Sequence, residues 1–200
     1  MTDPDPKTAR ILDAALPVFC QYGYRKTSMQ DIATAAGMSR AALYLRFTNK
    51  DDIFRAGSIR AHTEVAAAIA TALDGSSSTG DPFDRIHAAL TAFASGLMSE
   101  IAMSPHGAEL FDASLELVGD VVRDARASLA SQIASTLRDA ERAGAISLAA
   151  VGATPDSLAT LLLATNDGMK HAAPGSDLSS EDGLALQLRL IRRSVTIEAT

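Results

Sequence analysis

The sequence predicts an all-α fold of about nine helices. Apolar residues recur at intervals of three and four along most of the chain, the spacing of one face of a helix. Apolar residues make up 47% of the 200 residues and aromatic residues only 4%, a composition that favours packed helices over a β-sandwich. Ser, Thr or Asn stands before several of the apolar segments, where it can cap a helix. A chain of this length can form one or two domains with a sizeable core.

The first helix is expected over residues 7–22. An apolar stripe runs from Ile11 to Tyr22, and Gly23 follows it as a suitable helix C-terminus. Pro17 lies inside the stripe and should kink the helix, because proline has no backbone N–H to donate.

Two short helices joined by a tight turn are expected next. Ser28 caps the first of them with Asp31 in a capping box, and Gly37 ends it. Ser39 caps the second, which is expected over residues 40–47. This helix pair is the part of the chain that most directly predicts a function.

The outer face of the helix at 40–47 is unusual for a surface in water. At about 100° per residue, Leu43 and Phe47 face inward. The residues on the opposite side are small or aliphatic: Ala41, Ala42 and Leu45. Tyr44 and Arg46 flank that side. The pattern favours insertion into the major groove of DNA; the alternative is an ordinary helical hairpin with a solvated rim.

The run T-S-M-x-D-I-A-x-x-A-G-M-S-x-x-x-L-Y-x-x-F-x-x-K-D-x-I-F extends from Thr27 to Phe54. Together with the helix before it, the run resembles the N-terminal signature of the TetR family of bacterial transcription regulators, over roughly residues 11–54. The rest of the chain is similar only in length and helical layout. The resemblance implies an N-terminal three-helix DNA-binding domain, a C-terminal domain for effector binding and dimerisation, and repression of nearby genes relieved by a small molecule.

We expect the DNA-binding residues to divide between bases and phosphates. Arg40 and Ala42 should face bases, with Ala41 or Leu45 against a thymine methyl, and Ser39 begins this helix. The predicted phosphate contacts are Ser28, Gln30, Tyr44, Arg46 and Lys50. Lys50 is included because a lysine at a helix N-terminus adds charge to an anion site.

Charge is distributed unevenly along the chain. The net charge is −6, but residues 1–60 hold nine Lys and Arg against six Asp and Glu, and residues 61–200 hold nine against eighteen. The basic excess coincides with the helix pair, where a phosphate backbone would be attracted.

The predicted domains are residues 1–50, for DNA binding, and 51–200, for effector binding and dimerisation. A helix over 50–73 connects them, and residues 75–82 form a break. Further helices are expected over 82–102, 105–115, 118–143 and 155–172, with a last helix after its cap at Ser179.

The last two helices should form a homodimer interface. The last helix has two apolar rows, one of which includes Leu184 and Leu188 and the other Leu186 and Leu190. One row should pack on its own subunit and the other on a partner, in a four-helix bundle; which face is the interface stays open. The residues assigned to dimerisation are Leu161, Gly168, Leu184, Leu188, Ile191 and Val195.

A cavity for a small effector is expected among the helices of the C-terminal domain. Few aromatic residues and no buried basic cluster favour an uncharged or cationic apolar ligand. The candidate lining residues are His62, Phe93, Leu97, Met98, Ile101, Phe111, Leu115, Leu162 and Asn166.

No enzymatic motif is found, and we expect no catalysis, no cofactor and no metal site. Gly-rich phosphate loops, CxxC and HExxH motifs and a G-x-S-x-G elbow are missing. No apolar run approaches the ~20 residues that cross a bilayer, and the single cysteine, Cys20, fits the cytoplasm. The expected partners are an operator in double-stranded DNA, a second copy of the chain and an unidentified effector. Two alternatives are a regulator without a small-molecule effector and an all-helical binding or carrier protein.

Overall fold

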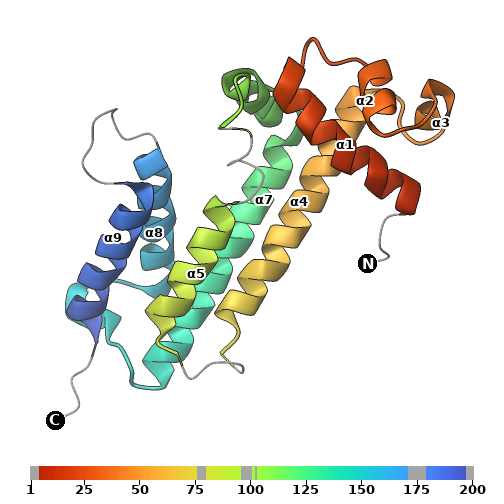
Figure 1. Ribbon diagram of the computed structural model, residues 1–200. Coiled ribbons are helices and arrows are strands. Elements are labelled where there is room, and N and C mark those ends of the chain that lie inside the picture. Colours follow the sequence, from red (N-terminus) through yellow and green to blue (C-terminus); the bar gives the residue numbers. More distant parts are fainter. Residues whose placement is uncertain (1–4, 76–79, 96–100, 102, 171–178, 197–200) are drawn as a thin grey trace. The chain divides into compact units, whose positions relative to one another are not determined.

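The computed structural model describes residues 5–75, 80–95, 101, 103–170 and 179–196. These residues form helices, which confirms the all-α prediction (Figure 1). The helices are α1 (Pro6–Tyr22), α2 (Met29–Ala35), α3 (Arg40–Tyr44), α4 (Lys50–Leu73), α5 (Pro82–Ala94), α7 (Gly107–Arg142), α8 (Pro155–Lys170) and α9 (Ser180–Val195), with a 3₁₀ turn over Leu148–Val151.

The chain forms two compact units. The first contains residues 1–64 and 95–124, and the second contains residues 65–94 and 125–200. Helices α4 and α7 each contribute to both units. The two predicted domains, residues 1–50 and 51–200, do not coincide with these units, since the first unit also includes the start of α4 and of α7. The division between DNA binding and effector binding therefore remains a prediction.

The first unit packs α1, α2 and α3 against the beginnings of α4 and α7. The side chains of Phe19, Tyr24 and Phe54 form an aromatic cluster with ring centroids 5.4–5.6 Å apart, a favourable spacing for ring pairs. The fully buried residues of this core include Ile11, Ile32, Leu43, Ile53, Ile101, Leu110 and Val118.

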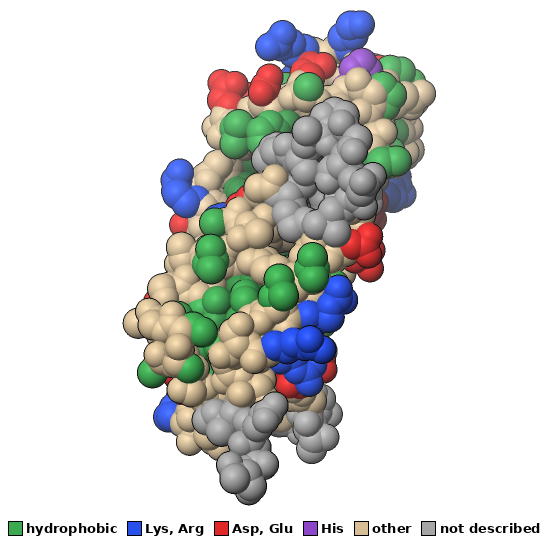
Figure 2. Space-filling view, turned by 90° about the vertical axis from the view of Figure 1, so that its left-hand side faces the viewer, with side chains coloured by type: hydrophobic (Ala, Val, Ile, Leu, Met, Phe, Trp, Pro, Cys, Tyr) green, Lys and Arg blue, Asp and Glu red, His purple; other side chains and the backbone are tan. Residues whose placement is uncertain are grey.

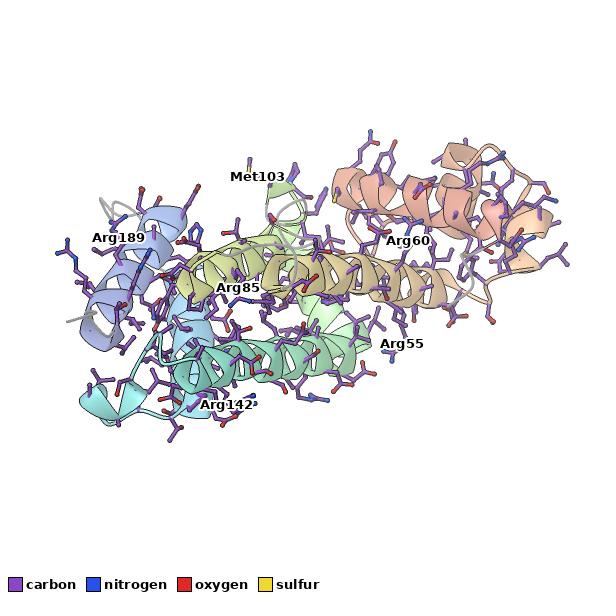
Figure 3. All side chains as sticks on the ribbon, turned by 90° about the horizontal axis from the view of Figure 1, so that it is seen from below. Arg55, Arg60, Arg85, Met103, Arg142 and Arg189 are labelled. Atoms are coloured by element: carbon purple, nitrogen blue, oxygen red, sulfur yellow. The ribbon has the colours of Figure 1, made fainter. Side chains whose placement is uncertain are left out.

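Arginines tie α4 to its neighbours in the first unit. Arg55 and Arg60 both extend from α4 (Figure 3). Arg60 donates to the Asp13 carboxylate of α1 at 2.6 Å, and Arg55 makes a two-pronged pair with Asp120 of α7 at 2.5 and 2.8 Å. Arg55 also donates to the carbonyl of Leu117 at 2.7 Å. The hydrogen bonds from Arg55 hold the pKa of the Asp120 carboxyl well below its usual range.

Another arginine ties α1 to the end of α2. Arg10 Nε donates to the carbonyl of Ala36, and its Nη2 donates to the carbonyl of Gly37, both at 2.8 Å. Helices leave their last carbonyls without a partner in the helix, and Gly37 has φ +60°, a conformation that favours glycine. Arg10 therefore caps the helix whose end leads into α3.

The second unit packs α5, the later part of α7, α8 and α9 around one apolar core. The fully buried residues of that core include Ile86, Leu90, Leu129, Ile133, Leu137, Leu148 and Leu162. Ion pairs add to the packing at the surface, where Arg126 pairs with Asp167 and Arg138 donates to Asp156 at 3.0 Å.

Three predicted boundaries are wrong. Helix α3 ends at Tyr44 rather than at residue 47, although Phe47 N still bonds to the carbonyl of Leu43 at 3.1 Å, so the turn continues as an irregular one. The helix predicted over 82–102 ends at Ala94. The two helices predicted over 105–115 and 118–143 are one helix, α7, because no proline interrupts the apolar face that continues from Leu110 to Val118.

The predicted dimer residues on α9 need correction. Leu184, Leu188 and Val195 are buried by their own chain inside the second unit, and Ile191 packs beside them. The other row remains exposed, with Leu190 at 60% and Leu186 at 39%, as does Leu161 of α8 at 55%. Figure 2 faces α9 and shows hydrophobic side chains at the surface there. Burial within the subunit thus selects the second row as the one available to a partner.

Replacing Arg10 with Met should lower the free energy of unfolding by roughly 1–2 kcal/mol, because two carbonyls lose a charged donor while the aliphatic stem is kept. Urea unfolding followed by circular dichroism measures the change. Lys7→Met, an exposed substitution on the same helix, is the matched control; equal stability of the two variants would refute the capping role.

The stabilising effect of the Arg55–Asp120 pair should depend on pH. Because the folded-state pKa of Asp120 is lowered, its contribution is complete above the ordinary carboxyl pKa of about 3.9 and is lost as the pH falls below it. Asp120→Asn should therefore be less stable than wild type at pH 7, and the difference should shrink toward pH 3. A difference that is the same at both pH values would contradict the assignment.

Candidate DNA-binding site

The α2–α3 pair is fixed by side-chain caps at both helix starts. Ser28 N donates to Asp31 Oδ2 at 2.9 Å and Asp31 N donates to Ser28 Oγ at 3.3 Å, which is the capping box that the sequence predicts. Ser39 Oγ accepts a hydrogen bond from Ala42 N at 3.1 Å. Both serines are thus used locally, although both remain exposed.

Helix α3 presents the outer face that its sequence predicts. Leu43 is fully buried and Phe47 nearly so, while Leu45 is 87% exposed and Tyr44 is 44% exposed. Ala41 is exposed and Ala42 half-buried. The Leu45 side chain therefore contributes little to packing within the first unit and is open to solvent.

Arg40 lies against Tyr44, one turn along α3. The guanidinium carbon is 5.3 Å from the centre of the Tyr44 ring, within the range of a cation–π contact, and Nη2 donates to the Tyr44 hydroxyl at 3.3 Å. This contact restricts the flexible arginine on the exposed side of the helix. The Arg40 guanidinium is a two-pronged donor of the kind that binds a guanine edge, and it lies beside the Tyr44 hydroxyl, which could bond to a phosphate.

Arg46 is held by the start of α1. Its Nη1 forms an ion pair with Asp5 and donates to Thr8 Oγ1 at 3.1 Å. A phosphate would have to compete with the Asp5 carboxylate for this guanidinium. The phosphate contact predicted for Arg46 stays a prediction, and Asp5 is the group that would compete with phosphate for it.

Lys50 occupies a position that the sequence does not reveal. Its ammonium group donates to the carbonyls of Tyr24, Arg25 and Thr27 at 2.6, 3.0 and 3.0 Å, and it lies 4.6 Å from the centre of the Tyr24 ring. All three N–H groups of the ammonium are therefore used. Lys50 closes the α1–α2 turn, and a phosphate contact would require it to give up one carbonyl.

The same turn carries a hydrogen bond that sequence reasoning missed. The Tyr24 hydroxyl donates to the Asp51 carboxylate, and burial together with that carboxylate raises the pKa of Tyr24. The two residues are 27 positions apart, and no spacing rule connects them. The bond fixes Tyr24 beneath Lys50, so that the aromatic cluster and the turn support each other.

Gln30, the remaining predicted phosphate contact, lies exposed on α2. Its side-chain amide donates to Thr34 Oγ1 at 3.2 Å, an exposed bond that a phosphate could replace. The exposed residues of the site are thus Ser28, Gln30, Ser39, Arg40, Ala41, Tyr44, Leu45 and Arg46, with Ala42 and Lys50 partly covered.

The residues predicted to line an effector cavity are divided between the two units. In the first unit, Ile101 lies in the core, Phe111 and Leu115 are exposed, and His62 Nδ1 lies 2.8 Å from the carbonyl oxygen of Ser58. In the second unit, Phe93 is partly buried and Leu162 is part of the core. Leu97 and Met98 are outside the described residues. The cavity itself stays a prediction.

Asn166 of α8 is the most informative of these residues. It is 3% exposed, and its Nδ2 has no hydrogen-bond partner among the described residues. A buried amide N–H without a partner is costly, so a polar atom from a bound molecule or water would stabilise it.

A surface groove of about 160 Å³ lies between α5 and α9 of the second unit. None of the predicted effector-site residues lines it. The lining residues are Phe83, Asp84, His87, Ala185, Leu188, Arg189 and Arg192.

Two classes of site are not found in the part of the chain that the structure describes. No group of three or more His, Cys, Asp or Glu residues there could hold a metal ion. None of the described helices is both long and apolar enough to span a membrane.

Comparison with known proteins finds a family that matches part of the first unit. Residues 11–56 match the family model described as bacterial regulatory proteins, tetR family. The HTH-type transcriptional repressor ComR of Escherichia coli is 47% identical over 45 residues, which are 22% of this chain and 21% of ComR. AcrR of Shigella flexneri is 50% identical over 44 residues and is matched over 20% of its length. The chain thus matches about a fifth of the length of these curated relatives.

Solved structures extend the likeness to the whole fold. A regulatory protein of the tetR family from Rhodococcus RHA1 is 25% identical, with a TM-score of 0.62, over 98% of this chain and all of that one. SmeT, the repressor of the Stenotrophomonas maltophilia multidrug efflux pump SmeDEF, is 20% identical, with a TM-score of 0.68, over 96% of this chain and 91% of SmeT. A complex of SmeT with triclosan has the same fold, with a TM-score of 0.67 at 20% identity over 98% of this chain and 94% of that chain.

The matched residues 11–56 contain the whole of α1, the capped α2–α3 pair and the start of α4. The resemblance to the TetR family of bacterial transcription regulators, which the sequence predicts from residues 11–54, is therefore confirmed by this match and by the fold that the chain shares with regulators of that family.

Proposed function

We propose that this chain is a transcriptional repressor that binds an operator in double-stranded DNA as a homodimer and is released by a small effector. The observation that carries the proposal is the orientation of α3, with Leu43 buried, Leu45 almost fully exposed and Arg40 lying over the exposed Tyr44 ring. The names of ComR and SmeT, both repressors, support the direction of regulation.

On DNA, α3 would lie in the major groove. Arg40 is positioned to donate to a guanine edge, and Leu45 to contact a thymine methyl. Ser28, Gln30, Tyr44 and Arg46 would hold phosphates on either side, and Lys50 would act mainly by keeping the α1–α2 turn closed. In a symmetric dimer two such helices would meet successive major grooves about 34–36 Å apart, on a palindromic operator.

The dimer would use the exposed apolar side chains of α8 and α9. Leu161, Leu186 and Leu190 lie on these two helices and are open to solvent in the single chain. Large aliphatic residues grouped at a surface are typical of an interface, and a four-helix bundle from two copies would bury them. Gly168, exposed on α8, would allow close approach.

The effector would bind in the C-terminal part of the chain and shift the DNA-binding units. SmeT, which has this fold, forms a complex with triclosan, and this supports an apolar effector. The unpartnered amide of Asn166 favours a ligand that also carries a hydrogen-bond acceptor. A coupling of about 1–3 kcal/mol would weaken operator binding roughly 5- to 150-fold.

Arg40→Ala should reduce sequence preference without removing DNA binding. On a duplex that wild-type protein selects from random sequences, the loss should be about 1–3 kcal/mol, roughly 5- to 150-fold, whereas affinity for unrelated DNA should change little. Fluorescence anisotropy on both duplexes measures the two affinities.

Arg46→Ala is the contrasting variant. Loss of a phosphate contact should weaken both duplexes alike and reduce the slope of log affinity against log salt by about 1. Arg142→Ala, on the second unit, is the control for lost positive charge. If no consensus sequence is selected, or if Arg40→Ala and Arg46→Ala lose specificity equally, the proposed readout is wrong.

Leu190→Asp should convert the dimer to a monomer, because a carboxylate would be buried in the proposed interface. Sedimentation velocity at micromolar concentration gives the mass. Ala127→Asp, at an exposed position of α7, adds the same charge outside the proposed interface and should stay dimeric. A monomeric wild type, or a dimeric Leu190→Asp variant, would exclude this interface.

A further inference from the structure

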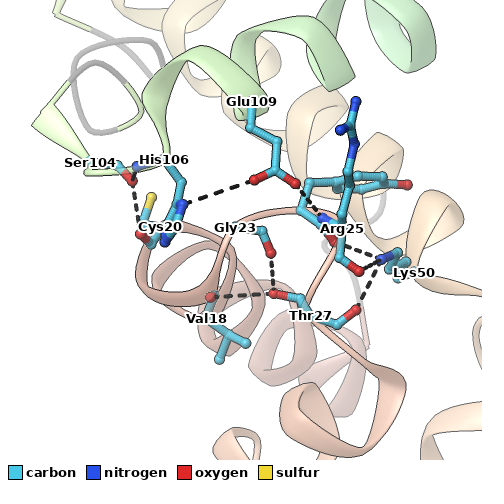
Figure 4. A network of polar contacts seen from close by, with 10 residues as sticks. Val18, Cys20, Gly23, Arg25, Thr27, Lys50, Ser104, His106 and Glu109 are labelled. Carbon is cyan, nitrogen blue, oxygen red and sulfur yellow. Dashed lines mark hydrogen bonds and ion pairs between the residues drawn. The ribbon is translucent and has the colours of Figure 1, made fainter.

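The turn between α1 and α2 is held from two sides (Figure 4). On one side, Lys50 at the start of α4 donates hydrogen bonds to three carbonyls of the turn. Thr27, buried inside the turn, donates to the carbonyl of Gly23 at 2.7 Å. The second side is formed by the beginning of α7, a segment about 80 residues further along the chain.

Glu109, in the first turn of α7, reaches the backbone of this turn. Its Oε1 accepts a hydrogen bond from the backbone N–H of Arg25 at 2.6 Å. Gly23 makes room for the carboxylate, because a Cβ at that position would collide with Glu109 Oε2. Gly23 also has a φ of +82°, a backbone conformation that residues with a side chain rarely adopt. The close approach therefore depends on glycine.

A second bond, from Ser104, strengthens the same junction. Ser104 Oγ donates to the carbonyl of Cys20, at the end of α1, at 2.8 Å, and accepts from the backbone N–H of His106 at 3.0 Å. His106 Nδ1 lies 3.9 Å from Glu109 Oε2. The end of α1 and the turn after it are thus bonded at two points to the segment that begins α7.

An acid in the first turn of a helix has an ordinary explanation, since the helix dipole favours it there. The dipole does not explain why the carboxylate accepts a bond from Arg25. A negative charge in the DNA-binding unit also opposes phosphate, so its electrostatic effect on DNA binding is unfavourable. The bond across the turn supplies the reason for a carboxylate at this position.

We propose that Glu109 is a positioning residue for DNA binding, which fixes the α1–α2 turn and with it the start of α2. The inference rests on the proposed function. Helix α7 continues without a break to Arg142, and Leu129, Ile133 and Leu137 on it lie in the core of the second unit. One helix therefore carries both the bond to the turn and part of the core of the unit in which we expect the effector.

The test compares three variants on the duplex selected by the wild-type protein. Glu109→Leu keeps the size of the side chain and removes the acceptor, and it should weaken binding roughly 5- to 20-fold. Glu109→Gln keeps an acceptor for Arg25 N–H and should restore most of the affinity. Asp112→Asn removes one negative charge from an exposed position of α7 and should bind as tightly as wild type or more tightly.

Whether Glu109→Leu weakens or strengthens DNA binding distinguishes a positioning role of Glu109 from an effect of its charge. A purely electrostatic role predicts that Glu109→Leu binds DNA more tightly, as Asp112→Asn should. Affinities are measured at a temperature at which circular dichroism shows every variant fully folded, so that loss of folded protein cannot imitate the effect. If Glu109→Leu does not fold, Glu109→Met, which also lacks an acceptor for the backbone N–H of Arg25, replaces it with the same expected loss, and wild-type affinity in that variant would overturn the inference.

Wild-type affinity in Glu109→Leu, or no rescue by Glu109→Gln, would overturn the inference while leaving the proposed function intact. Failure of the wild-type protein to select any sequence would overturn the proposed function, and this inference with it.

Discussion

The first unit depends on burial of one side of a helix that is too short to be stable by itself. Helix α3 has five residues, and isolated helices of this length do not form in water. Its conformation is imposed by the Ser39 cap and by Leu43, which is fully buried. Because the buried Leu43 fixes how α3 is rotated about its axis, the residues on the opposite side of the helix face outward. The exposed Leu45 is a consequence of that anchoring.

The same unit shows how charged side chains can serve as structural caps. Arg10 satisfies the carbonyls of Ala36 and Gly37, directly after α2, and Lys50 satisfies three carbonyls of the α1–α2 turn. Loops and helix ends leave carbonyls that need donors, and in this unit cations supply them from neighbouring helices. Basic residues near the proposed DNA-binding surface are therefore not all available to phosphate. Arg40, whose guanidinium lies over an exposed tyrosine, is the more available cation.

The sequence predicted the local features well and the long-range ones poorly. The caps at Ser28 and Ser39, the inward Leu43 and the all-α class follow from spacing within a few residues. The partners of Lys50 and Glu109 lie 23 to 84 positions away, and no local pattern reveals them. The choice between the two apolar rows of α9 also could not be made from periodicity, because both rows have helical spacing and only packing decides which is buried. The break predicted inside α7 was wrong for a related reason, since a continuous buried face outweighs weak local signals.

The central claim is that the outer face of α3 lies against bases. Its most direct test is nuclear magnetic resonance of the full chain, labelled in Ala and Leu methyl groups, bound to the duplex that it selects. The account predicts nuclear Overhauser effects from the methyls of Ala41, Ala42 or Leu45 to protons of the DNA major groove, including a thymine methyl. A saturated complex in which these methyls show no contact with DNA, while methyls elsewhere do, would contradict it.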